Sequence, residues 1–215
     1  MVIQQFVVGP VMTNCYLLGD EATHEAAFID PGEQGERLAR EAHQQGWHVA
    51  AILLTHAHFD HIAGVKDLLS CLVELQPGEA VPVYVHPTDY PEAPASFGRG
   101  ITLEGVPNVR HYRDGDQVQV GKLTVTVIGT PGHTRGGVTL QVEDALFTGD
   151  TLFAGSCGRT DFATSSQEDM MASLKKLAQL EGDYRVYPGH EDTSTLDWER
   201  QHNIFVRWAL QDKMF

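Results

Sequence analysis

The fold is decided by residues 49–65, VAAILLTHAHFDHIAGV. The run from Val49 to Leu54 is continuously apolar, which predicts a strand covered on both faces. Apolar residues at helical spacing begin at Ile62, so the polar segment between the two lies where a buried strand turns into a helix. Because α/β sheets gather their functional residues at such strand ends, we expect a functional site in this segment.

The polar segment, residues 55–61, carries four residues of metal-ligand type. Residues two apart at the end of a strand point the same way, so His56 and His58 can face one metal ion. Asp60 and His61 fall in the turn before the helix, from which they can reach a second, nearby position. A lone histidine is usually an ordinary core or surface residue, but the pattern HxHxDH favours a metal site.

Three more ligand-type residues occupy equivalent places later in the chain. His133, Asp150 and His190 each come at or just after the end of a predicted strand, beside a glycine that lets the backbone turn sharply. The combined set of histidines and aspartates suits zinc, iron or manganese, and not calcium, which prefers oxygen ligands alone. The set contains no cysteine, which disfavours a closed structural zinc site. Seven ligands suffice for two metal ions that share one aspartate, with room for a bridging hydroxide, so we expect a catalytic site.

The predicted elements fall into two blocks, each of strands followed by helices. Strands are predicted at residues 2–8, 14–18, 26–29, 49–55, 81–86, 117–120, 123–128, 138–142, 145–148 and 184–187, and helices at 36–45, 62–75, 167–180 and 196–210. No linker divides the blocks, so we predict a single domain over residues 1–215. Two helix-covered sheets packed against each other would make it a four-layer α/β/β/α sandwich.

Two local features refine this picture. Ser165 and Glu168 stand at capping-box spacing, which predicts the start of the helix at 167–180. Residues 87–108 are rich in proline and glycine and have little periodicity, which predicts a long loop, either a lid over the site or a surface loop.

The composition narrows the partners and the compartment. Lys and Arg number 15 against 29 Asp and Glu, and the resulting charge of −14 repels phosphate backbones, so we expect no nucleic-acid partner. The longest apolar run is too short to span a bilayer, and the N-terminus does not resemble a signal peptide. Three widely spaced cysteines without a CxxC pair fit a reduced setting, so we expect a cytoplasmic protein. The oligomeric state stays open.

The ordered motifs HxHxDH, PGHT, GDT and PGH resemble the metallo-β-lactamase superfamily over essentially the whole chain. Within it, GDTLF at 149–153 and GRTDF at 158–162 resemble the compact glyoxalase II-like (hydroxyacylglutathione hydrolase-like) enzymes, as do Asn14-Cys15-Tyr16 and Asp30-Pro31-Gly32. The resemblance agrees with the four-layer fold and implies that Asp30 lies near the metal loops, although a turn-forming Asp before Pro-Gly is an equal alternative. It assigns the first metal to His56, His58 and His133, the second to Asp60, His61 and His190, and the bridging position to Asp150.

Departures from the family pattern bear on the substrate. Arg159 holds the place of the basic residue that meets glutathione in the family's thioesterases, and we expect it to bind substrate. Asp161 and Asp192 stand where those enzymes have tyrosines, and their basic C-terminal extension is missing. Most of the expected glutathione clamp is therefore absent.

The leading hypothesis is hydrolysis of a small thioester such as S-lactoylglutathione by a hydroxide that bridges two divalent metal ions. Zinc is the first choice of metal, with iron or manganese as alternatives. Asp60 is expected to act catalytically by orienting the hydroxide or holding its proton, besides binding metal. One alternative is a mononuclear Fe(II) persulfide dioxygenase of the same superfamily, with His56, His133 and Asp150 as ligands. Another is a metal-binding protein without catalysis.

Overall fold

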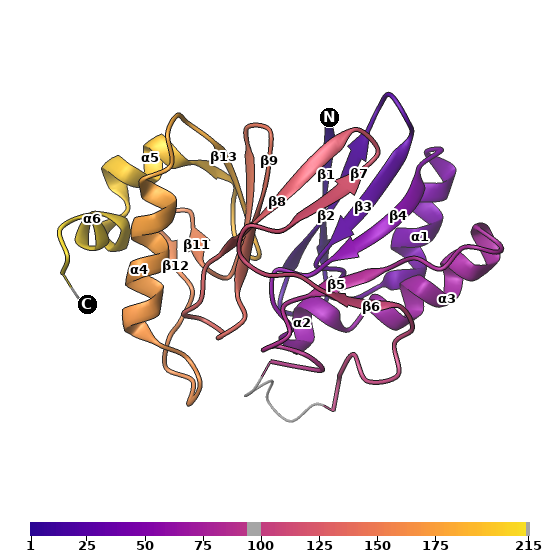
Figure 1. Ribbon diagram of the computed structural model, residues 1–215, viewed down its shortest axis with the longest axis horizontal. Coiled ribbons are helices and arrows are strands. Elements are labelled where there is room, and N and C mark those ends of the chain that lie inside the picture. Colours follow the sequence, from indigo (N-terminus) through magenta and orange to yellow (C-terminus); the bar gives the residue numbers. More distant parts are fainter. Residues whose placement is uncertain (94–99, 214–215) are drawn as a thin grey trace.

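Two six-stranded sheets pack face to face in the computed structural model, and helices cover the outer face of each (Figure 1). The structure describes residues 1–93 and 100–213. The predicted four-layer α/β/β/α sandwich is confirmed. No helix in these two ranges is long and apolar enough to cross a membrane.

The first sheet comes from the N-terminal half and has the strand order β1-β2-β3-β4-β5-β6. Its elements are β1 (Val2–Val8), β2 (Thr13–Asp20), β3 (Glu25–Ile29), α1 (Gly35–Gln44), β4 (His48–Leu53), α2 (Phe59–Ile62), α3 (Val65–Leu75), β5 (Val83–Val85) and β6 (Val109–His111). The strands from β3 to β6 pair in parallel, so their carboxyl ends meet at one edge of the sheet. This edge receives the loop that follows β4.

The second sheet comes from the C-terminal half and has the strand order β14-β13-β10-β9-β8-β7. Its elements are β7 (Gln117–Val120), β8 (Leu123–Gly129), β9 (Val138–Val142), β10 (Ala145–Gly149), the hairpin β11 (Leu152–Phe153) and β12 (Ser156–Cys157), α4 (Gln167–Ala178), β13 (Arg185–Pro188), β14 (Ser194–Thr195), α5 (Leu196–His202) and α6 (Ile204–Leu210). Strands β10 and β13 are parallel neighbours, which brings the loops after them together.

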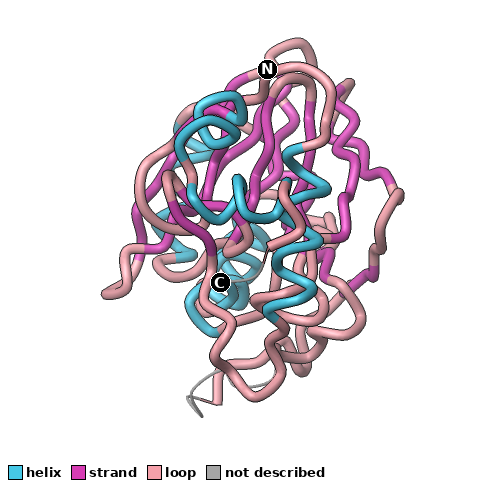
Figure 2. Tube along the Cα trace, turned by 90° about the vertical axis from the view of Figure 1, so that its left-hand side faces the viewer, coloured by secondary structure: helices cyan, strands magenta, loops and turns pink. Residues whose placement is uncertain are grey.

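Three apolar clusters separate the four layers. One lies between the first sheet and the helices α1 and α3, where Leu38 and Leu68 are fully buried. The middle cluster lies between the sheets and includes Tyr16 and Phe147, whose rings meet edge to face. The third lies under α4 to α6, which cover the second sheet in Figure 2. Alternate strand residues point to different clusters, as expected for sheets buried on both faces.

The helix predicted at residues 62–75 is wrong at its start, because the chain forms two helices, α2 and α3, with a break at Gly64. The Gly64 amide donates to the carbonyl of Pro31 at 2.9 Å, and a Cβ at position 64 would lie 2.7 Å from that same oxygen. The close approach of a distant loop therefore ends the first helix, and only glycine leaves room for it.

Two predictions about the C-terminal helices are also wrong. The helix expected at 196–210 is divided at Asn203, whose backbone is extended and whose side chain accepts from the amides of Phe205 and Val206 to begin α6. The capping box at Ser165 does not form, because Ser166 is the N-cap of α4 and accepts from the Asp169 amide at 3.1 Å.

The short strands β6, β11, β12 and β14 were not predicted, since two or three residues carry too little periodicity. Of the loop predicted at 87–108, residues 94–99 lie outside the described part. Its flanks pack on the core, where Ala93 and Leu103 are buried. Whether the loop acts as a lid stays a prediction, as does the single-domain interpretation.

Candidate metal centre

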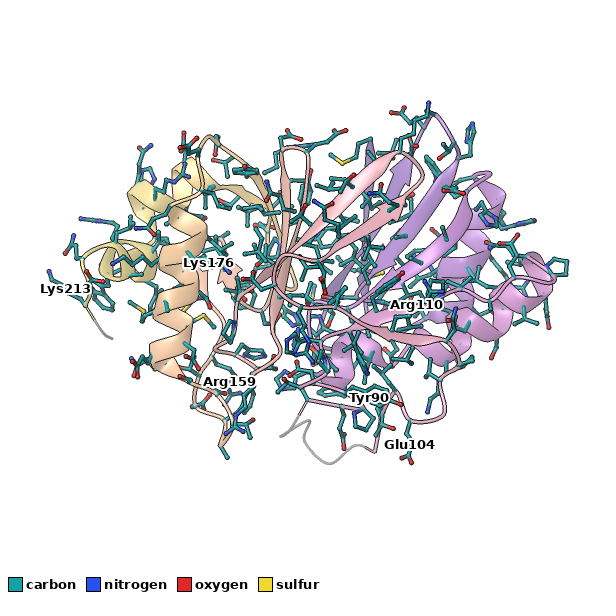
Figure 3. All side chains as sticks on the ribbon, in the orientation of Figure 1. Tyr90, Glu104, Arg110, Arg159, Lys176 and Lys213 are labelled. Carbon is teal, nitrogen blue, oxygen red and sulfur yellow. The ribbon has the colours of Figure 1, made fainter. Side chains whose placement is uncertain are left out.

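All seven predicted ligands meet where the loops of both sheets converge, at the carboxyl ends of β4, β8, β10 and β13. Figure 3 shows a dense group of side-chain nitrogen atoms in this region, at the lower end of the sandwich. The HxHxDH segment leaves β4 and enters α2, and the loops after β8, β10 and β13 add one residue each. The parallel strand pairs explain why residues so far apart in sequence come together.

The first triad consists of His56, His58 and His133, whose ligand atoms all lie within 4.8 Å of one another. The Nδ1 atom of His58 is 2.9 Å from the Nε2 atom of His133. All three side chains are buried. The arrangement offers three imidazole nitrogens to one position.

The second triad consists of Asp60, His61 and His190, whose ligand atoms also lie within 4.8 Å of one another. The Oδ2 atom of Asp60 is 3.2 Å from His190 Nε2 and 3.7 Å from His61 Nε2. This position therefore combines one carboxylate with two imidazoles.

Asp150 stands between the triads. Its Oδ2 atom lies 3.3 Å from His133 Nε2 in the first triad and 3.6 Å from His190 Nε2 in the second, and its Oδ1 atom lies 3.4 Å from His61 Nε2. A Cβ on Gly189 would come within 2.4 Å of Oδ1, so a glycine before His190 is needed for this approach.

Asp30 orients one ligand of the second triad. Its Oδ2 atom lies 3.0 Å from His61 Nδ1, and its carboxylate also accepts from the amide and hydroxyl of Thr55 at 2.7 and 2.5 Å. A hydrogen bond at Nδ1 directs Nε2 of the same ring towards the centre. Asp30 also has a positive φ of 50°, a conformation that Asp and Asn tolerate better than most residues. Its role in the turn and its position near the metal loops are therefore compatible.

The two triads differ in their electrostatics. Burial lowers the pKa of His56 well below its usual range and that of His58 to about 4. In the second triad burial acts in the same direction on His61, but the charges of Asp150 and Asp30 outweigh it and raise its pKa. The pKa of His190 is raised likewise, against burial, by its hydrogen bond with Asp60.

The carboxylates of the centre are ionised at neutral pH. Burial opposes this, yet His190 and His61 lower the pKa of Asp60 to about 2. Burial also opposes ionisation of Asp150, whose pKa is held far below its usual range by His61 and His133.

Divalent cations fit this set of side chains. His56 Nε2, His61 Nε2 and Asp150 Oδ1 are buried without a hydrogen-bond partner in the described structure, although buried polar atoms normally have one. Imidazole nitrogens and carboxylate oxygens suit zinc, iron and manganese. The unsatisfied atoms of three side chains thus point to a metal pair at this position.

A pocket of about 760 Å³ opens onto the centre. Its walls are largely apolar and include Val11, Phe59, Phe153 and Phe162. Cys157 also lines it, and burial raises the pKa of this thiol to about 12, so it is not a thiolate nucleophile.

Arg159 lies on the pocket wall, as the substrate-binding prediction requires, but its guanidinium is already paired. Both of its bonds to the Asp161 carboxylate are 2.6 Å long, and its Cζ atom lies 4.6 Å above the ring of Phe162. Its carbonyl accepts from His133 Nδ1 at 2.9 Å, a contact that the sequence did not predict. Figure 3 shows Arg159 at the same lower end of the sandwich as the nitrogen-rich region.

The sequence also did not predict what holds the His190 loop. Asn14 donates its side-chain amide to the carbonyls of Pro188 and Glu191 at 3.0 and 2.9 Å, and the hydroxyl of Tyr16 donates to Pro188 at 2.7 Å. The motif Asn14-Cys15-Tyr16 was the available signal, but nothing in it indicates partners more than 170 residues away.

Comparison with known proteins agrees with this geometry. Residues 8–190 match the family model of the metallo-beta-lactamase superfamily. A hydroxyacylglutathione hydrolase of Tolumonas auensis is 39% identical over 172 residues, which are 79% of this chain and 59% of that enzyme. The crystal structure of the B3 metallo-beta-lactamase BLEG-1 has a TM-score of 0.82 at 33% identity and covers 95% of this chain and 99% of its own. The structure of TTHA1623 in a di-iron-bound form has a TM-score of 0.77 at 34% identity, over 94% and 99% of the two chains.

Proposed function

The chain belongs to the metallo-beta-lactamase superfamily, and from this premise we propose that it is a binuclear metallohydrolase of small thioesters, with S-lactoylglutathione as the first substrate to test. The observation that carries the proposal is the position of Asp150, whose two oxygens face histidines of both triads. The similarity to a hydroxyacylglutathione hydrolase supports the thioester class.

A pair of divalent cations, when bound, would lower the pKa of water from 15.7 towards about 7 and polarise the thioester carbonyl. His56, His58 and His133 would hold one cation and Asp60, His61 and His190 the other, with Asp150 between them. We take zinc as the first metal to test and iron as the second, since a similar protein has a di-iron form.

Asp60 is suited to orient the attacking water. With a pKa near 2 its carboxylate is ionised at neutral pH and accepts hydrogen bonds. Thr13 donates its hydroxyl to Asp60 Oδ2 at 3.3 Å, which fixes the direction of the carboxylate towards His190 and the pocket. Orientation of the nucleophile is thus the role that its environment favours.

Hydrolysis of a thioester requires few further catalytic groups in the pocket. A thiolate leaves readily because a thiol has a pKa of about 8.5, so no strong general acid is required. The aromatic side chains of Phe59, Phe153 and Phe162 line the pocket and offer an apolar surface to the acyl group.

The test is metal analysis of the purified protein together with hydrolysis of S-lactoylglutathione and other thioesters. We expect two metal ions per chain and turnover that chelation removes and added metal restores. One iron per chain with oxygen uptake on glutathione persulfide would instead establish the dioxygenase alternative. Two metals without turnover of any thioester would contradict the substrate class while leaving the metal centre intact.

A further inference from the structure

Asp89 is a buried carboxylate that the proposed chemistry does not use. It lies in the turn after β5, where its amide donates to the carbonyl of His86 at 3.0 Å, and none of its surface is exposed. Its Oδ2 atom has no hydrogen-bond partner, and burial raises the pKa of the carboxyl. An ionisable group in such a place costs stability, so its presence calls for a role elsewhere in the molecule.

The carboxylate of Asp89 is hydrogen-bonded to the loop that carries His133. Its Oδ1 atom accepts from the Gly136 amide at 2.8 Å, three residues beyond that ligand. The Thr134 hydroxyl lies close enough to oppose the rise in the pKa of Asp89, although Thr134 Oγ1 and Asp89 Oδ2 lack a hydrogen bond of good geometry. Asp89 is therefore bonded to the loop that carries His133 through the Gly136 amide.

The segment that carries Asp89 also contacts the backbone between the other two ligands of the first triad. The Ala57 amide, between His56 and His58, is also near enough to Asp89 to lower its pKa. Four residues beyond Asp89, the amide of Ala93 donates to the Ala57 carbonyl at 2.9 Å. The backbone between His56 and His58 is thus bonded to the segment 89–93 through Ala93.

Gly136 is the counterpart that permits this approach. A Cβ at position 136 would lie 2.6 Å from Asp89 Oδ1 and 2.9 Å from His86 Nδ1. The carboxylate and the loop backbone are therefore fitted to each other across 47 residues of sequence.

We propose that Asp89 is a positioning residue for the first triad, which joins the His56–His58 segment to the His133 loop and so sets the distance between their imidazoles. It corresponds to Asp30, which acts on the second triad through His61. The inference rests on the proposed metal centre and is independent of the substrate.

The test measures Zn²⁺ binding to single-triad proteins by calorimetry. A His190→Ala background leaves the first triad complete, and a His58→Ala background leaves the second. In the first background we expect Asp89→Ala to weaken Zn²⁺ binding about 10- to 100-fold, as loss of groups that orient ligands generally does. In the second background the same substitution should change the affinity less than twofold.

Asp89→Asn is the conservative variant. It keeps an acceptor for the Gly136 amide, so we expect its Zn²⁺ affinity to lie between those of Asp89→Ala and the unsubstituted His190→Ala protein. If Asp89→Ala does not fold, the comparison of Asp89→Asn with the unsubstituted background is the test. Val120→Ala, a buried change at the end of β7 where Val120 pairs with Leu123, should lower the melting temperature without changing Zn²⁺ affinity.

The outcomes separate cleanly. Equal affinities of Asp89 and its variants in the His190→Ala background would overturn the inference, and so would equal weakening in both backgrounds. Failure of the wild-type chain to bind two Zn²⁺ ions would instead overturn the metal centre itself.

Discussion

The two ligand triads lie side by side yet are prepared for metal in different ways. The first is made of imidazoles, and burial lowers the pKa of His56 and His58, so both are neutral at physiological pH. The second sits among carboxylates, which raise the pKa of His61 well above its usual range and also raise that of His190. His56 and His58 are thus ready to bind a cation, whereas His61 must release a proton to do so.

This contrast gives Asp150 its importance, because its two oxygens face histidines of both triads. Its Oδ1 atom faces His61 of the second triad, and its Oδ2 atom faces His133 of the first and His190 of the second. Substitutions can therefore be designed to affect both positions, or only one of them.

Asp150→Ala should have the largest effect because it affects both triads at once. We expect kcat/KM for thioester hydrolysis to fall at least about 10³-fold and the metal content to fall below two per chain. His133→Ala should also abolish turnover, while circular dichroism shows that the fold persists. Asp144→Ala, an exposed change in the turn between β9 and β10, is the control and should stay near wild type. Near wild-type turnover by Asp150→Ala would end the shared-ligand interpretation.

Asp30→Asn should affect the second triad more than the first, because Asp30 is hydrogen-bonded to His61 directly but to His56 only through the Thr55 hydroxyl. Asparagine tolerates the positive φ at this position but loses the charge that faces His61 Nδ1. In the His58→Ala background we expect Zn²⁺ affinity to fall about 10- to 100-fold. Asp20→Asn is a matched control, since Asp20 is also a buried acceptor of backbone amides but lies away from the site. An equal loss in both single-triad backgrounds would contradict the separation of the triads.

The pH dependence of metal binding tests the contrast itself. Below the raised pKa of His61, a cation must displace a proton, so affinity at the second triad should fall about tenfold for each pH unit. At the first triad His58, with a pKa near 4, and His56 have no proton to lose above about pH 6, so the dependence should be weaker. Calorimetry of the two single-triad proteins in buffers of different ionisation enthalpy measures the protons released. Equal proton release at both triads would contradict the proposed difference in the pKa values of their histidines.

The convergence of the candidate ligands could be predicted from the sequence because each belongs to a short motif at a strand end. Such a motif is local: glycine, strand and ligand lie within a few residues, as in Pro188-Gly189-His190. The order of strands and helices then sufficed for the layer architecture, since each buried face must find a partner.

The features that were missed depend on partners far away in the chain. Gly64 breaks a helix because Pro31 approaches it, and Asp89 acquires its surroundings from Gly136. Neither contact has a periodic or compositional signal. Ser165 and Ser166 are both good N-cap residues, and tertiary contacts chose between them: Ser165 donates its hydroxyl to the carbonyl of His133.

Arg159 is an intermediate case, since its position on the pocket wall was predicted but its partner Asp161 was not. The side chains are 56% and 65% exposed, so their ion pair is screened by solvent and can be exchanged for a substrate carboxylate. Asp161→Asn should therefore lower KM for S-lactoylglutathione only about two- to fivefold, with kcat and metal content unchanged. A thioester without charged groups should show no change, and Arg159→Gln should remove the gain in the double variant. This small effect would show that Arg159 acts on the substrate, in contrast to the large effects at the metal triads, and an unchanged KM would place Arg159 outside substrate binding.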